Sequence, residues 1–201
     1  MRSSILITSI GGIRGRDLAL KLKRGLKGTK VFTGDKNFQE NMEFFSDGFF
    51  QLKDTNQNKK YISHLLKIVK EKKIQLIIPG SDDEAILMSK YKKKIFKAGS
   101  KVSIVDYKVL KKFKDKFNTY KELTQNKIFN IYWEKIRSTS ELKIKIKKKL
   151  SSIDSVVIKP VYSRGGRDIT IVENKNIKTK NFNDNKEIAV SKKNFLNKYI
   201  K

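Results

Sequence analysis

Residues in the last third of the chain have the types and spacing that bind phosphate groups. Lys159 follows the apolar run Ser155–Ile158, and the loop Ser163-Arg164-Gly165-Gly166-Arg167 comes shortly after it. Glycines let backbone N–H groups turn toward phosphate oxygens, and the lysine and arginines add positive charge. A hairpin turn that simply requires glycine is the alternative, but it does not explain a lysine where the apolar pattern predicts a buried side chain. We therefore favour a phosphate-binding loop that closes over a nucleotide.

A second glycine-bearing turn lies near the start of the chain. Gly11-Gly12-x-x-Gly15 follows the apolar run Ser4–Thr8, and Asp35 ends the next apolar run. A dinucleotide-binding fold has G-x-G-x-x-G at this place and an acidic residue about 20 residues further on. Ile10 stands where the first glycine belongs, so the fingerprint is incomplete. We favour glycines that only allow a tight turn, with ligand binding as the alternative.

The remaining polar motifs are explained by local structure. Pro79-Gly80-Ser81-Asp82-Asp83-Glu84 and the pair Asp115-Lys116 are typical of helix starts, where carboxylates complement the helix dipole. His64 and Trp133 are interpreted as packing residues. The sequence has no Ser-His-Asp arrangement, no H-E-x-x-H and no metal-spaced set, so we expect no catalytic residue and no metal ligand from this chain.

Strands and helices alternate in the first half of the chain. Helical periodicity is found at residues 18–26, Tyr61–Val69 and Asp82–Phe96. Nearly continuous apolar runs are typical of strands buried on both faces of a parallel sheet. The five expected strands are Ser4–Thr8, Lys30–Thr33, Phe49–Leu52, Ile74–Ile78 and Val102–Val105. Residues 1–112 are therefore predicted to form an α/β domain with a parallel, Rossmann-like sheet.

The pattern changes after residue 112. Helices are expected at Asp115–Leu123 and Ser140–Leu150, and a strand at Ile128–Trp133. An antiparallel hairpin over residues 155–172, a loop at Glu173–Glu187 and a short strand at Ile188–Val190 complete the chain. Residues 113–201 are therefore predicted to form a separate, partial α+β subdomain.

The composition excludes some classes of protein, but the net charge alone does not identify a function. There are 47 basic and 20 acidic side chains, a net charge of +27, and only seven of the basic residues are arginine. Solvated lysines on helix faces are favoured over a nucleic-acid surface, which would cluster its cations on one face and bind with steep salt dependence. No cysteine is present, which excludes disulfides and thiolate zinc sites. No apolar stretch approaches the ~20 residues of a membrane span, so we expect a cytoplasmic protein that binds no membrane.

Several of these motifs resemble one known family. The segment Val157–Arg167 resembles the phosphate-lid strand and loop of ATP-grasp enzymes, most closely the large subunit of carbamoyl-phosphate synthase and more distantly biotin carboxylase. Those families carry an Asp-Lys or Asp-Arg pair some forty residues earlier, and Asp115-Lys116 lies 43 positions before Lys159. Ile5–Gly12 and Pro79–Glu84 resemble the domain that precedes the ATP-grasp core. Leu196–Ile200 resembles the adenine-lining hinge, with Asn197 in place of the usual glutamate.

The resemblance implies ATP and Mg²⁺ as cofactors, and it implies roles for particular residues. Lys116 and Lys159 would contact the nucleotide phosphates as electrostatic clamps. The phosphate lid would consist of Ser163, Arg164, Gly165, Gly166 and Arg167, although Asp168 replaces a glycine often found there. Lys198, Tyr199 and Ile200 would border the adenine. Gly11, Gly12, Ser81 and Asp82 are the candidates for binding the second substrate.

The function implied is that of the N-terminal portion of an ATP-dependent carboxylate ligase. Such enzymes transfer the γ-phosphoryl group to a carboxylate, and a nucleophile then displaces it. The family's magnesium ligands lie beyond the hinge, so we expect a chain truncated at the hinge, inactive alone and completed by a downstream polypeptide. Its substrates would be a nucleotide and a small carboxylate or amine. A non-catalytic relative that binds a nucleotide or small acid is the alternative, and a basic nucleic-acid-binding protein is the third hypothesis.

Overall fold

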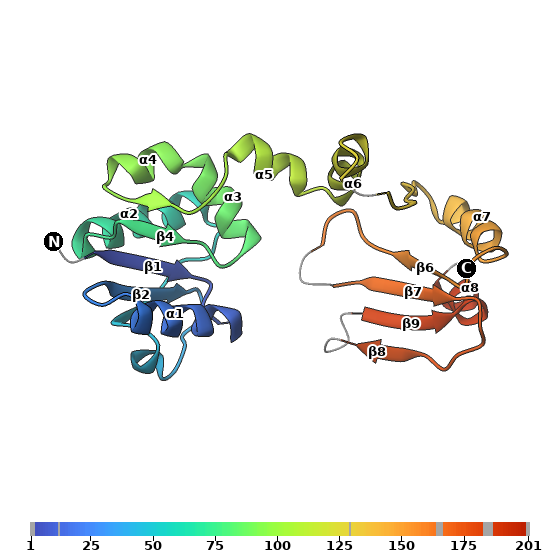
Figure 1. Cartoon of the computed structure of the whole chain (residues 1–201), viewed down its shortest axis with the longest axis horizontal. Coiled ribbons are helices and arrows are strands. Elements are labelled where there is room, and N and C mark those ends of the chain that lie inside the picture. The colour runs from blue at the N-terminus through green and yellow to red at the C-terminus, as the bar shows by residue number, and fades with distance from the viewer. Residues whose placement is uncertain (1–2, 12, 129, 164–166, 183–186, 200–201) are drawn as a thin grey trace. The chain divides into compact units, whose positions relative to one another are not determined.

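The chain folds into two compact units, Met1–Lys111 and Lys112–Lys201 (Figure 1). The computed structural model describes residues 3–11, 13–128, 130–163, 167–182 and 187–199. Five candidate binding residues from the sequence analysis lie outside the described residues: Gly12, Arg164, Gly165, Gly166 and Ile200.

The first unit is built on a five-stranded, all-parallel sheet, which confirms the predicted architecture. Its strand order is β3-β2-β1-β4-β5. The strands are β1 (Ser4–Thr8), β2 (Lys30–Asp35), β3 (Gly48–Gln51), β4 (Leu76–Ile78) and β5 (Lys101–Val102). The connections contain α1 (Ile13–Gly25), the short 3₁₀ turn η1 (Met42–Phe44), α2 (Asn58–Lys72), α3 (Asp82–Lys90) and α4 (Lys92–Lys97), and α5 (Tyr107–Phe113) follows β5.

Both faces of this sheet are buried, each against its own apolar core. Side chains alternate along a strand, so Leu6 of β1 enters one core while Ile5 and Ile7 enter the other. Leu6 packs with residues of α2, α3 and α4, such as Leu65. The opposite core contains Ala19 of α1. This double coverage explains why the strands are continuous apolar runs in the sequence.

The second unit contains a four-stranded mixed sheet with the order β6-β7-β9-β8. Its strands are β6 (Ser155–Ile158), β7 (Ile169–Glu173), β8 (Lys180–Phe182) and β9 (Glu187–Ser191), and its helices are α6 (Lys116–Gln125), α7 (Thr139–Lys149) and α8 (Lys192–Tyr199). The pairs β6–β7 and β8–β9 are antiparallel, whereas β7–β9 is parallel. The core joins α7, the sheet and α8 through Ile146, Leu150, Val172, Val190 and Phe195.

Several expected elements differ from the observed ones. The single helix predicted over Asp82–Phe96 is interrupted at Tyr91, whose φ of −103° and ψ of 12° leave the helical region. The fifth strand ends at Val102, three residues earlier than expected. Residues 130–133 and Ile128 form no strand. The expected loop after Glu173 contains β8, and the parallel β7–β9 pair makes the sheet mixed instead of antiparallel.

Candidate functional site

The start of α6 is fixed by a carboxylate that also contacts the segment after β6. Asp115 caps the helix by accepting the backbone N–H of Asn118 at 3.1 Å. Its other oxygen accepts the hydroxyl of Tyr162 at 3.1 Å. This bond raises the pKa of Tyr162, because the neighbouring negative charge disfavours the phenolate. Asp115 therefore has the cap role expected from the sequence, and it also joins α6 to the candidate phosphate loop.

Lys116 points its ammonium group at the first residue of that loop. Its Nζ donates to the backbone oxygen of Ser163 at 2.8 Å and to the Ser163 hydroxyl at 2.7 Å. The backbone N–H of Lys116 donates to the carbonyl of Val161 at 3.2 Å. Residues 47 positions apart in the sequence are thus brought into direct contact. The Lys116 ammonium thus donates to two oxygens of Ser163. Phosphate oxygens are acceptors of the same kind for a lysine.

Lys159 lies in a different environment from the one the sequence predicts. The strand β6 ends at Ile158, and Lys159 is exposed between that strand and Pro160. The expectation of a buried lysine inside the strand is therefore wrong, because side chains alternate along β6 and Lys159 continues the face of the exposed Val157. The strand goes no further because Pro160 lacks the N–H that would continue the ladder. The Lys159 ammonium instead donates to the hydroxyl of Tyr120 on α6 at 3.1 Å. Both candidate lysines thus lie where α6 meets residues 159–163.

The other predicted nucleotide-binding residues are placed as follows. Arg167 is exposed just before β7, and Asp168 beside it has a positive φ of 59°, a conformation that favours glycine. Lys198 is exposed on α8, so the expected adenine hinge is helical at this point. Lys198 lines a shallow depression with Thr179, Asn194 and Asn197. Tyr199 is the last residue of the same helix.

Tyr120 and Tyr162 are site residues that sequence reasoning missed. Tyr120 is four positions after Lys116, a spacing that places both on one helix face and could have indicated it. Tyr162 lies inside the segment that resembles the phosphate lid, but its partner Asp115 becomes visible only when α6 packs against that segment.

A second polar cluster lies at the carboxyl ends of β1 and β4. Glu84 on α3 is 4% exposed and accepts the hydroxyls of Thr8 at 2.7 Å, Ser9 at 2.6 Å and Tyr61 at 2.9 Å. Ser81 donates to the same carboxylate at 3.3 Å and caps α3 through the N–H of Glu84. The strand order reverses between β1 and β4, which is where open parallel sheets bind ligands.

The glycine turn after β1 is fixed by Asp35 of β2. The N–H of Gly11 donates to one carboxylate oxygen of Asp35 at 2.9 Å, and the N–H of Asn37 donates to the other at 3.0 Å. Asp35 is only 8% exposed. Its carboxylate thus stabilises the turn, which supports the favoured interpretation of these glycines.

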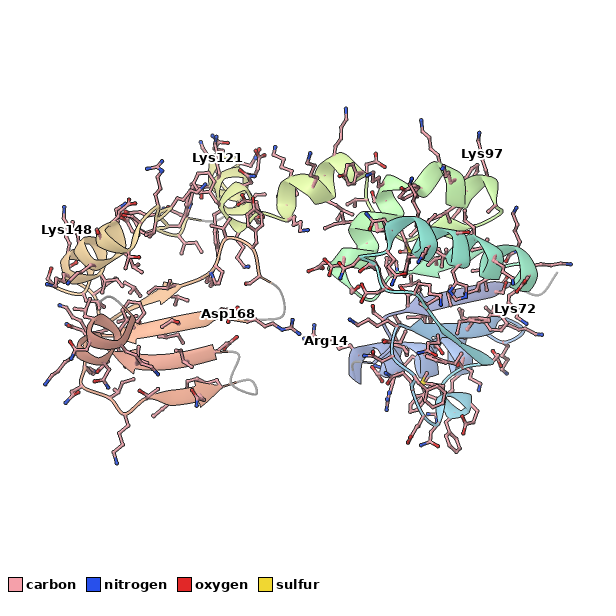
Figure 2. The ribbon with its side chains drawn as sticks, turned by 180° about the vertical axis from the view of Figure 1, so that it is seen from behind. Arg14, Lys72, Lys97, Lys121, Lys148 and Asp168 are labelled. Atoms are coloured by element: carbon pink, nitrogen blue, oxygen red, sulfur yellow. The ribbon has the colours of Figure 1, made fainter. Side chains whose placement is uncertain are left out.

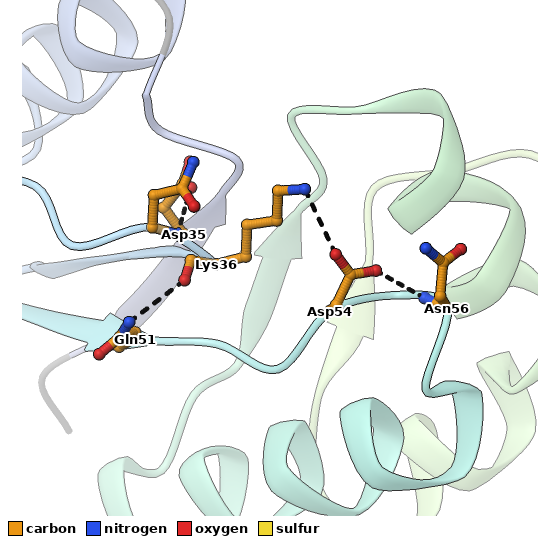
Figure 3. Close-up of polar contacts among 6 residues, drawn as sticks. Asp35, Lys36, Gln51, Asp54 and Asn56 are labelled. Carbon is orange, nitrogen blue, oxygen red and sulfur yellow. Dashed lines mark hydrogen bonds and ion pairs between the residues drawn. The ribbon is translucent and has the colours of Figure 1, made fainter.

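The charges beside Asp35 stabilise the neighbouring loops (Figure 3). Lys36 extends to Asp54, with an Nζ–Oδ2 distance of 3.3 Å. Gln51 donates to the backbone oxygen of Lys36 at 3.3 Å, and the N–H of Asn56 donates to Asp54 at 2.8 Å. Of the candidate substrate-binding residues, Gly11 and Asp82 are exposed and Ser81 is half-buried at this edge of the sheet.

Two features are absent from residues 3–11, 13–128, 130–163, 167–182 and 187–199. Among these residues, no group of three His, Asp or Glu side chains is arranged to hold a metal ion. Every helix in these ranges is too short or too polar to span a lipid bilayer.

The comparisons with known proteins agree with the geometry. Residues 5–104 match the PylC-like N-terminal domain. Those residues, 100 of the 201 in the chain, are similar to the N-terminal domain of PylC-like ATP-grasp enzymes. The predicted resemblance is thereby confirmed, and it extends in fold beyond the PylC-like domain. No curated protein sequence gives a significant match to the chain.

Solved structures of ATP-grasp proteins share the fold. The L-amino acid ligase from Bacillus licheniformis has a TM-score of 0.60 and 14% identity, and the match covers 85% of this chain and 39% of the ligase. The biotin carboxylase domain of Hydrogenobacter thermophilus 2-oxoglutarate carboxylase, solved with MgADP, ADP and bicarbonate, has a TM-score of 0.56 and 16% identity, with 84% and 37% covered. Rhizobium etli pyruvate carboxylase also has a TM-score of 0.56, with 14% identity and 85% and 15% covered. The chain thus spans about two fifths of the first two structures.

Proposed function

We propose that the chain binds ATP through its second unit, as the phosphate-binding part of an ATP-grasp carboxylate ligase. The observation that carries the proposal is the pair of ammonium groups at the junction of α6 and residues 159–163. Lys116 contacts Ser163 there, and Lys159 contacts Tyr120. These are the two lysines for which the family resemblance implies phosphate contacts.

The chemistry of the two lysines fits phosphate binding without covalent participation. An ammonium group has three N–H donors, so a lysine bound to one or two protein oxygens can still bond a phosphate oxygen. A phosphate oxygen would replace Ser163 as a hydrogen-bond acceptor of Lys116, or would bind the ammonium beside it. In phosphoryl transfer the protein mainly positions the reactants and offsets negative charge. Lys116 and Lys159 would therefore act as clamps and not as nucleophiles.

The reaction we propose is transfer of the γ-phosphoryl group of ATP to a small carboxylate, which forms an acyl phosphate and releases ADP. A nucleophile such as an amine then attacks the acyl carbon and displaces inorganic phosphate. The carboxyl edge of the first unit's sheet, with Gly11, Ser81 and Asp82, is the proposed place for this second substrate. Mg²⁺ is the metal expected of the family, but no cluster of acidic residues in the described ranges fits it. We therefore assign no magnesium ligand to this chain and propose that a further polypeptide completes the cleft. The carbamoyl-phosphate-synthase-like branch remains our proposal for the nearest relatives.

Calorimetric titration of the purified chain with ATP tests the proposal. Lys116→Ala and Lys159→Ala are each expected to weaken ATP binding roughly tenfold, because each removes a charge-assisted hydrogen bond. Lys121→Ala is the matched control, since Lys121 is an exposed lysine of the same helix that projects outward (Figure 2). Unchanged ATP affinity in both site variants would overturn the proposal.

The binding-only alternative makes a different prediction for turnover. A ligase should release ADP in a carboxylate-dependent manner once a polypeptide that completes the cleft is added. A nucleotide- or small-acid-binding relative would bind ATP with the same dependence on Lys159, yet release no ADP under any of these conditions.

A further inference from the structure

Two aromatic residues of α6 pack against Trp133 in the segment that follows the helix. Phe117 and Tyr120, three positions apart, both contact Trp133. The Phe117 ring meets the indole edge-on, with centroids 5.3 Å apart, and the Tyr120 ring stacks on it at 6.2 Å and 23°. The indole N–H of Trp133 donates to the Thr124 hydroxyl at 2.8 Å. The Tyr120 ring is thus held by its own helix and by Trp133.

A lysine contacts each end of this aromatic group, but the two contacts differ in kind. Lys135 places its ammonium 4.7 Å from the centre of the Phe117 ring, which is a cation–π contact. The Lys159 ammonium is 5.8 Å from the centre of the Tyr120 ring but only 3.1 Å from its hydroxyl oxygen. Lys159 therefore contacts the oxygen and not the ring face. The bond depends on a single atom of Tyr120.

We infer that Tyr120 is a positioning residue that holds the Lys159 ammonium ready for a nucleotide phosphate. The inference rests on the proposed function and extends it to a residue outside the motif that resembles the family. The Tyr120 hydroxyl uses one of the three Lys159 donors and leaves two for phosphate oxygens. The ring itself is immobilised by Trp133, so the hydroxyl is a fixed acceptor.

Tyr120 should raise the affinity for ATP because it orders the Lys159 side chain before the nucleotide binds. A free lysine side chain on a protein surface samples many rotamers, and immobilising it costs binding free energy. The bond to Tyr120 already restricts the Lys159 side chain in the unbound protein, so less conformational entropy is lost when ATP binds. Loss of the hydroxyl alone should therefore weaken ATP binding about 2- to 10-fold, the range expected for one immobilised side chain. Adenosine, which has no phosphate, should bind with unchanged affinity.

Tyr120→Phe is the decisive variant because it keeps the ring and its stacking on Trp133. Tyr132→Phe is the matched control, since Tyr132 is exposed and contacts Lys149 through its ring face at 3.4 Å. Calorimetry with ATP and with adenosine should show a selective loss for ATP in Tyr120→Phe only. In the double variant with Lys159→Ala, the effect of Tyr120→Phe should disappear, because there is then no ammonium to position.

A second measurement does not require nucleotide. An amine-acylating reagent followed by mass spectrometry should modify Lys159 faster in Tyr120→Phe than in the wild type, with Lys121 unchanged as the internal reference. Equal labelling of Lys159 in the two proteins would overturn the inference. So would a weakened ATP affinity in Lys159→Ala with none in Tyr120→Phe. If Lys159→Ala itself leaves ATP affinity unchanged, the proposed function fails, whereas the labelling result still decides whether Tyr120 holds Lys159.

Discussion

Individual buried carboxylates hold the loops at the carboxyl edge of the first unit's sheet. Glu84 is the clearest case, because one carboxylate accepts hydroxyls from β1, α2 and the turn that begins α3. The sequence explains Glu84 as a first-turn carboxylate of a helix. That explanation is correct for its place on α3, but it does not predict the hydroxyls of Thr8, Ser9 and Tyr61, which reach it from distant parts of the chain.

Replacing this carboxylate should destabilise the first unit. Glu84→Ala leaves the buried hydroxyls of Thr8 and Tyr61 without their acceptor, so we expect a loss of about 3 kcal/mol in the free energy of unfolding. Urea unfolding followed by far-UV circular dichroism measures this change. Trp133 is the chain's single tryptophan and lies in the second unit, so its fluorescence transition should not move. The matched control is Glu71→Ala on α2, an exposed partner of Lys67, with an expected change below about 0.5 kcal/mol.

Tyr61 gives the first unit a dependence on alkaline pH. Burial, and then the nearby Glu84 charge, raise the pKa of Tyr61 above its ordinary value of 10.0. A raised pKa favours the protonated form in the folded state, so the stabilisation is complete below about pH 10 and is lost as the pH rises above it. Tyr61→Phe should be less stable at pH 7 because it loses the bond to Glu84. Above pH 10 its stability should fall less steeply than that of the wild type, by up to ~1.4 kcal/mol per pH unit. Parallel stability curves for the two proteins up to pH 11 would contradict this assignment.

At the scale of elements, predictability follows burial. The five parallel strands were foreseeable because burial on both faces requires continuous apolar runs, as in β1. β8 was missed because all three of its residues are exposed at a sheet edge and have no apolar signal. Ile128–Trp133 has the composition of a strand, but its described residues, Ile128 and 130–133, form none, and Trp133 packs on α6 instead. Pairing partners are a property of the folded chain, and local sequence does not encode them.

The site was foreseeable to the same extent. Motif spacing indicated Lys116, Lys159 and Ser163, and the structure brings Lys116 and Ser163 into contact. The contact between Lys159 and Tyr120 depends on how α6 packs against the end of β6, so spacing alone did not predict it.

Gly80 is the position where two elements approach too closely for a side chain. A Cβ atom at Gly80 would lie 2.2 Å from the backbone oxygen of Thr8, so the chain after β4 would have to move away from the end of β1. Gly80→Ala should therefore cost more than about 2 kcal/mol of unfolding free energy, as overpacking against backbone does. Gly25→Ala is the control, because no atom lies within 4 Å of a Cβ there and alanine favours the helix by up to about 1 kcal/mol. Far-UV circular dichroism in urea should show the two variants shifting in opposite directions.

At the scale of the whole molecule, the net charge of +27 makes a prediction separate from the ATP site. The exposed lysines labelled in Figure 2 lie on different helices, with Lys72 on α2, Lys97 on α4, Lys121 on α6 and Lys148 on α7. A nucleic-acid surface would concentrate such charges on one element or face. Lysines distributed in this way attract polyanions through counterion release, without reading their sequence.

We therefore expect single-stranded DNA to bind only at low salt and without sequence preference. Its affinity should fall at least about 300-fold between 50 and 200 mM salt if six or more phosphates are contacted. Lys159→Ala and Lys121→Ala should weaken this binding equally and slightly, since each removes one of many equivalent charges. ATP binding should instead distinguish the two variants, because Lys159 acts there at a defined position next to Tyr120. Fluorescence anisotropy with labelled oligonucleotides of different sequence measures the first effect and calorimetry the second. Sequence-selective DNA binding that persists at 200 mM salt would contradict this prediction and support a nucleic-acid function.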